Sequence, residues 1–166
     1  MLGAIPQGSK TLGPAGGTWQ TYVLASDVTN STLTFSDVTG LAWMAEPQAI
    51  YVYMAFIRFQ SAATTTGINF CINTPATPNY VVNAFTHCGN TTTNGFGSFS
   101  RADDTGASAA GSTGVDAINS DVPLFFHGNV SNGTTAGLMQ LRVHSEINTS
   151  QVTVKAGSTL LVMRVA

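Results

Sequence analysis

The sequence predicts an all-β fold, an antiparallel jelly-roll sandwich of about eight to ten strands with an extended N-terminal arm. Three observations predict it. Many short segments of the 166-residue chain are rich in β-branched and aromatic residues, as strands are. Turn signals such as Asn94-Gly95, Asn132-Gly133 and Ala156-Gly157 separate them. No stretch of a dozen residues keeps a helical apolar period, and a jelly roll arranges eight antiparallel strands in two sheets.

Residues 1–18 differ from the rest of the chain. They contain five glycines and two prolines with little periodicity, so we expect an extended arm there and one sandwich domain over residues 19–166. The strands that we expect within this domain, in order, span residues 19–25, 33–35, 49–59, 67–73, 80–86, 122–130, 138–147, 151–154 and 159–165. Residues 101–120 are small and polar, and they predict a long loop.

The segment 49–59, AIYVYMAFIRF, is apolar on both of its alternating faces, which is typical of a central strand covered on each side. One cover would be the domain core, and a partner subunit is a candidate for the other. The segment 138–147 instead alternates cleanly: Met139, Leu141, Val143 and Ile147 form an apolar face, whereas Gln140, Arg142, His144 and Glu146 form a polar one. It predicts a half-buried strand with a wet face.

Charged residues make up only 8% of the chain, against about 25% in an ordinary globular protein. An uncharged polar surface is easier to desolvate than a charged one, so this composition favours close packing against other proteins. The six Lys and Arg residues are scattered and the net charge is -2, which argues against a nucleic-acid partner. No segment is long and apolar enough to predict a membrane span. The start of the chain lacks the pattern of a signal peptide, so we expect synthesis in a cytoplasm.

Few residues suggest catalysis or metal binding. Cys71 and Cys88 lack the paired spacing of a structural zinc site, and we interpret them as free thiols, with a site shared with histidines as the alternative. The stretch 106–111, GASAAG, misplaces the second glycine of a serine-hydrolase turn. Asp103 and Asp104 are adjacent in sequence, and we interpret them as solvated acids of a loop. Two alternatives stay open: a calcium site formed with Asp116 and Asp121, and a pair of catalytic acids in a sugar-active enzyme. We therefore expect no catalytic residues, no cofactor and no metal.

The three histidines, His87, His127 and His144, show no HxH or HExxH spacing. His144 shares a polar strand face with Arg142, and three copies of it could meet at a trimer axis. An exposed or hydrogen-bonded strand histidine is the alternative. Five Asn-x-Ser/Thr triplets occur, at Asn30, Asn90, Asn129, Asn132 and Asn148, and we expect them to be unmodified.

Three stretches carry a resemblance to a known group of proteins: residues 24–32 (LASDVTNST) leading to 35–41 (FSDVTGL), residues 59–67 (FQSAATTTG), and residues 152–160 (VTVKAGSTL) with the ending Arg164-Val-Ala166. Over residues 19–166 the chain resembles small virion proteins of tailed bacteriophages and prophages, which occur as capsid decoration proteins and tail-associated modules. The Ala-Gly-Ser turn before the last strand is also similar to the end of C1q/TNF-like jelly rolls, which form trimers. Neither resemblance supplies catalytic residues.

The resemblance implies a non-enzymatic protein of the capsid surface, a decoration or cement protein made in the host bacterial cytoplasm. Its expected partners are copies of itself in a homotrimer and the major capsid protein of the shell, with neither nucleic acid nor membrane. A tail fibre normally has a long N-terminal shaft, and the short arm here favours a protein bound to a shell. The alternative is a tail-fibre head or receptor-binding tip that contacts a host glycan or protein through Trp43 and residues 94–99.

Two sets of residues are candidates for these contacts. The trimer-interface candidates are Val52, Met54 and Phe56 on one face of the central strand, Tyr51 and Tyr53 on its other face, and Arg142 and His144. All five residues of the central strand could equally be sandwich core. The candidates for attachment to the capsid are Leu2, Ile5, Pro6 and Leu12 in the arm and Trp19 where the domain begins.

Overall fold

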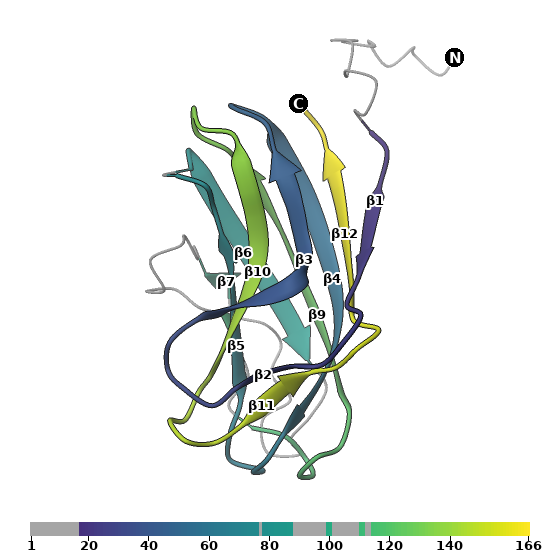
Figure 1. Cartoon of the computed structure of the whole chain (residues 1–166), viewed down its shortest axis with the longest axis vertical. Coiled ribbons are helices and arrows are strands. Elements are labelled where there is room, and N and C mark those ends of the chain that lie inside the picture. Colours follow the sequence, from purple (N-terminus) through teal and green to yellow (C-terminus); the bar gives the residue numbers. More distant parts are fainter. Residues whose placement is uncertain (1–16, 77, 88–98, 101–109, 112–113) are drawn as a thin grey trace, which may run out of the picture.

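The computed structural model describes residues 17–76, 78–87, 99–100, 110–111 and 114–166, and these form two antiparallel sheets packed face to face (Figure 1). The larger sheet follows the order β1-β12-β4-β9-β6-β7, with β11 beside β4 and β2 beside β11. Its strands are β1 (Gln20–Val23), β2 (Val28–Asn30), β4 (Ile50–Ser61), β6 (Tyr80–His87), β7 (Phe99–Ser100), β9 (Val122–Ser131), β11 (Val152–Val154) and β12 (Thr159–Arg164). The smaller sheet has the order β3-β10-β5-β8, made of β3 (Ser36–Ala45), β10 (Gly137–Ser145), β5 (Ile68–Asn73) and β8 (Ala110–Gly111).

The predicted all-β sandwich is confirmed. In the larger sheet the last long strand, β12, lies between β1 and β4, and in the smaller sheet β10 lies between β3 and β5. Strands that are distant in sequence are therefore hydrogen-bonded neighbours, so the chain crosses between the two sheets several times. The specific order of strand connections that defines a jelly roll stays a prediction. At the edge of the smaller sheet, β8 pairs with β5 over two residues. Among the described residues no helix could span a membrane.

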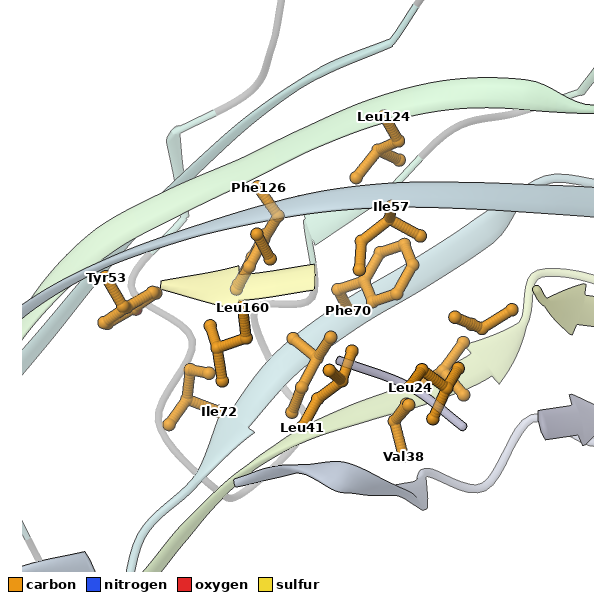
Figure 2. Packing of buried hydrophobic residues seen from close by; sticks show 14 of the residues in the cluster. Leu24, Val38, Leu41, Tyr53, Ile57, Phe70, Ile72, Leu124, Phe126 and Leu160 are labelled. Atoms are coloured by element: carbon orange, nitrogen blue, oxygen red, sulfur yellow. The ribbon is translucent and has the colours of Figure 1, made fainter. Parts of the chain in front are cut away.

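The core fills the space between the sheets with alternate side chains of both. Figure 2 shows Ile57, Phe126 and Leu160 of the larger sheet pointing toward Leu41 and Phe70 of the smaller one. All five are at most 3% exposed. Burial of side chains of this size stabilises the fold by about 1.5–3 kcal/mol each, so the sandwich needs no partner to form its interior.

The strand β3 is the largest departure from the sequence prediction, which placed a strand at residues 33–35 and none at 36–45. The buried residues of β3 are Val38, Leu41, Trp43 and Ala45, and the spacing between the first two is three rather than two. Gly40 sits between them with a φ of +106°, and the pairing with β10 shifts register there. This β-bulge hides the alternation that would have revealed the strand.

Buried asparagines join the loops to the sheets. Asn30 donates from Nδ2 to the carbonyl oxygens of Thr34 and Val143 at 3.0 and 3.1 Å, and its Oδ1 accepts from the Thr32 backbone N–H at 2.7 Å. Asn132 donates from Nδ2 to the carbonyl oxygens of Glu46 and Thr135 at 2.8 and 2.9 Å. Both are the first residue of an Asn-x-Ser/Thr triplet, and both are buried. In the folded protein these two side-chain amides therefore hold loops in place by hydrogen bonds.

A candidate assembly surface

The outer face of the larger sheet is built from five neighbouring strands. Because side chains alternate along a strand, the residues of β4 that do not enter the core, Val52, Met54 and Phe56, point outward. The strand register aligns their neighbours in three rows across the sheet. From β1 to β6, the first two rows are Val23, Thr159, Phe56, Phe125 and Thr86, and Thr21, Leu161, Met54, His127 and Ala84. The third row, from β12 to β6, is Met163, Val52, Asn129 and Val82.

Several large apolar side chains of this face are open to solvent. Phe56 is 53% exposed, Val23 57%, Val82 47% and Trp19 39%. A single exposed apolar residue is ordinary, but contiguous exposed apolar residues mark interaction sites on soluble proteins. We call these three rows, together with Trp19, the apolar face.

Aromatic side chains form a ridge at one end of the apolar face. The rings of Phe56 and Phe125 lie side by side with centroids 5.0 Å apart, and the His127 ring stacks on Phe125 at 4.7 Å. These contacts hold the Phe56 ring in place although half of it faces solvent. We call Phe56 and Phe125 the aromatic ridge.

A hollow of about 390 Å³ lies at the other end of the apolar face. Gly128 and the buried Tyr53 are among its lining residues, and the Tyr53 ring packs closely against the Gly128 backbone. The residues around the hollow come from three of the five strands, β4, β9 and β6, and from Trp19 just before β1. Its lining residues are Trp19, Val52, Tyr53, Met54, Val82, Ala84, His127, Gly128 and Asn129.

Charged residues lie at the ends of the apolar face. Arg58 pairs with Asp121 at 3.3 Å beyond the ridge, where Lys155 also pairs with Asp27. Hydrogen bonds from Lys155 and from the Ala156 backbone N–H hold the pKa of Asp27 below its usual value. Among the described residues, the three rows contain no Asp, Glu, Lys or Arg. The centre of the face is therefore free of formal charges on carboxylates, amines and guanidines.

The outer face of the smaller sheet has a different chemistry. Arg142 on β10 pairs with Asp37 on β3 at 3.0 Å, and the His144 ring meets Phe35 edge-on at 4.4 Å. The outward residues of β5 include Asn69 and Asn73, opposite His144 and Gln140. The cross-strand pair Met44 and Leu138, 68% and 48% exposed, adds apolar surface at one end.

The seven trimer-interface candidates separate into three places. Val52, Met54 and Phe56 belong to the apolar face. Tyr51 and Tyr53 are 5% and 1% exposed in the core, where their rings lie 5.9 and 5.8 Å from that of Trp43. The prediction of both tyrosines as interface residues is wrong, and their alternative reading as core is correct.

Arg142 and His144 lie on the opposite outer surface from Phe56, so one flat interface cannot hold them together with the apolar face. The wet face predicted for this strand holds for both, but Gln140 is 7% exposed. Trp19 lines the hollow, at the edge of the apolar face. The other attachment candidates, Leu2, Ile5, Pro6 and Leu12, lie outside the described residues.

The contacts expected for a receptor-binding tip are not supported. Trp43 is 2% exposed in the core, so it has no free ring face for a sugar. Its burial follows from the β3 bulge, which the sequence reading missed. Of the other candidates, residues 94–98 lie outside the described part of the chain, and for Phe99 only the place of its backbone in β7 is described.

The candidates for metal binding and catalysis do not gather in the described part of the chain. His127 and His144 face opposite outer surfaces, and Cys71 is buried. Asp121 is engaged by Arg58 and by the Gln60 amide at 2.8 Å. Within the described ranges no three His, Cys, Asp or Glu side chains form a group that could hold a metal ion. Cys88, Asp103 and Asp104 lie outside these ranges.

Sequence reasoning missed half of the apolar face. Phe125, Leu161, Met163, Val82 and Val23 were placed in strands but not assigned to a surface. Part of their signal was present: β12 carries apolar residues on both alternating faces, like β4, and β9 has Phe125 on its more polar face. Only the pairing of these strands with β4 shows that their outward residues form one continuous surface.

A comparison with protein-family models gives no match, and a comparison with curated proteins gives none either. Among solved structures, the chain is similar to the infectious bursal disease virus VP2 subviral particle, with 9% identity over 87% of this chain and 39% of that one and a TM-score of 0.23. It is also similar to the structure of the Gx strain of infectious bursal disease virus, with 9% identity over 91% of this chain and 37% of that one and a TM-score of 0.20. The chain thus spans about four tenths of the length of these proteins. At such TM-scores the likeness carries no argument about fold or function.

Proposed function

We propose that this chain is a non-enzymatic structural protein of a bacteriophage particle, bound to the capsid surface as a decoration or cement protein. The observation that carries the proposal is the apolar face, a contiguous surface on a sandwich whose core is complete without it. An apolar surface left over after folding favours permanent association with other proteins.

The chemistry of the chain supports a structural role. With 8% charged residues, little of the surface resists desolvation, and interface centres are themselves depleted of charge and enriched in aromatic residues and Met. The resemblance of residues 19–166 to small phage virion proteins supports the particle as the site of association. The proposed partners are other copies, in a homotrimer, and the major capsid protein.

The mechanism is mechanical. A protein bound where capsid subunits meet buries surface on more than one of them, so the subunits cannot separate without exposing it again. Three linked copies bind in concert, because after the first contact the others form at a high effective concentration. Firm attachment then needs only modest contacts per copy.

Electron cryo-microscopy of the parent particles tests this function. We expect density for the sandwich at regular positions over the shell, and mass spectrometry of the same particles should give many copies of the chain per particle. Density confined to the tail tip would replace the proposal with a receptor-binding role. Absence of the chain from purified particles would overturn both.

A further inference from the structure

We infer that the apolar face is a contact between copies of this chain, in which the aromatic ridge of one copy occupies the hollow of the other. The inference deepens the proposed function and rests on it, since it concerns the contact between two of the proposed copies. It names the occupant of the face as a second copy of the same sandwich.

The outer side of the sheet, which comprises the apolar face and the polar rim around it, has the area of a stable contact. β4 pairs with β9 over ten residues, from Ile50 to Phe59, which is about 33 Å at ~3.3 Å per residue. Five neighbouring strands at ~4.8 Å make the face about 24 Å wide. The product, about 800 Å², equals the area that each partner buries in an interface of standard size.

The chemistry of the face fits a copy of itself. Since the three rows hold no Asp, Glu, Lys or Arg, two such faces can approach without repulsion between like charges. A partner chosen by charge complementarity would require charged residues here. The charged pairs, including Arg58 with Asp121, lie beyond the rows, where a rim stays in water.

The shape of the face is also complementary to that of a second copy. The ridge, with Phe56 half exposed, stands at one end, and the hollow with its apolar walls Met54, Val82 and Trp19 lies at the other. A partly exposed aromatic ring and an apolar recess form the anchor and pocket of an interface hot spot. Because both features occur on every copy, two faces packed against each other about a twofold axis place each ridge in the hollow of the other copy.

Light scattering on the purified full-length chain tests the contact with three variants. Phe56→Glu places a charge on the ridge, and Ala84→Trp fills the hollow from its wall. Met44→Glu is the matched control, because it charges an exposed apolar residue on the other sheet. We expect an oligomer mass for the wild type and for Met44→Glu, and the 17.3 kDa mass of one chain for the other two.

Circular dichroism should show the same β content in all variants. If Phe56→Glu does not fold, Phe56→Thr retains strand propensity, and it should weaken association at least tenfold in sedimentation equilibrium. A wild-type chain with the mass of a monomer overturns the inference, as does an unchanged mass for both ridge and hollow variants. Imaging of particles tests the proposed function separately. If the chain is found on the shell but both variants keep the wild-type mass, this contact alone is wrong. If the chain forms the contact but is absent from particles, the proposed function alone is wrong.

Discussion

The Tyr53 hydroxyl reaches across Gly128 to donate a hydrogen bond to Oδ1 of Asn83, and so connects three adjacent strands inside the sandwich. Tyr53 on β4 pairs with Gly128 on β9, which pairs in turn with Asn83 on β6. The tyrosine and the asparagine are both at most 1% exposed. A glycine between them leaves the space that the ring needs, since a Cβ at this position would lie 2.6 Å from the Tyr53 hydroxyl.

Gly128→Ala should strongly destabilise the fold. A Cβ at this position would lie 2.0 Å from the Val82 carbonyl oxygen and 2.6 Å from the Tyr53 hydroxyl, so backbone must move. We expect a loss of about 3 kcal/mol, at the upper end of overpacking effects, measured by urea unfolding. Gly157→Ala is the comparison, because nothing lies within 4 Å there and only its φ of +86° opposes a side chain. Its cost should be about 1 kcal/mol; equal losses for both variants would contradict the steric argument.

Asn30→Ala should destabilise the protein by about 3 kcal/mol, since several buried groups lose hydrogen bonds at once. The Thr34 and Val143 carbonyl oxygens lose a donor, and the Thr32 backbone N–H loses its acceptor. Asn148→Ala, at an exposed asparagine of the same triplet type, should change the free energy of unfolding by less than about 0.5 kcal/mol. Similar midpoints of thermal unfolding for the two variants would show that the hydrogen bonds of Asn30 do not contribute to stability.

Tyr53 should make the fold sensitive to alkali. Burial raises the pKa of its hydroxyl well above the usual value, with a smaller contribution from Cys71. The folded protein keeps this proton while the unfolded chain releases it above about pH 10. The stabilisation is therefore complete below that pH and is lost as the pH rises toward the folded pKa. In urea unfolding between pH 9 and 11, stability should fall less steeply for Tyr53→Phe than for the wild type. Exposed Tyr80, changed to Phe, should leave the slope unaltered.

Asp27 should contribute to stability against acid. Its pKa is lowered by the hydrogen bond from Lys155, then by that from the Ala156 backbone N–H. A lowered pKa gives stabilisation that is present above the usual carboxylate pKa of about 4 and is lost as pH falls through the folded value. Asp27→Asn should thus lose less stability than the wild type between pH 5 and pH 2, as followed by tryptophan fluorescence. Asp116→Asn, at an exposed loop acid, serves as the control, and a wild-type pH slope in Asp27→Asn would exclude this role.

Removal of residues 1–18 should leave a folded oligomer that no longer binds capsids. The sequence assigns the arm to attachment through Leu2, Ile5, Pro6 and Leu12, whereas the sandwich core and the apolar face lie within residues 19–166. Co-sedimentation with purified shells measures binding, and light scattering checks the oligomer. Unimpaired capsid binding by the truncated protein would rule out the arm.

The strand pattern was readable from sequence wherever the period of two was unbroken. The central strand, expected at residues 49–59, is found at Ile50–Ser61 between β12 and β9, and the strand expected at 138–147 is Gly137–Ser145 with Met139, Leu141 and Val143 buried. Ile147 lies past the end of that strand and is exposed. Local periodicity is sufficient for such elements because burial repeats with the pleat.

The candidate site was only partly readable. The sequence showed that β4 has two apolar faces, but which of them faces the core depends on strand pairing that local pattern does not encode. Trp43 illustrates the limit: the bulge at Gly40 shifts the alternation by one residue, so a core side chain was taken for a surface contact. Arg142 and Phe56 were grouped by chemistry, although they belong to different sheets.

The absence of Asp, Glu, Lys and Arg from the three rows also determines how ionic strength would act on this surface. Dissolved ions screen attraction between opposite charges, and an apolar contact offers them almost nothing to screen. Sulfate and other kosmotropic salts strengthen apolar burial instead. An assembly held by these rows would therefore keep its contacts from low to high salt concentration, and cooling would promote its dissociation more than added salt would.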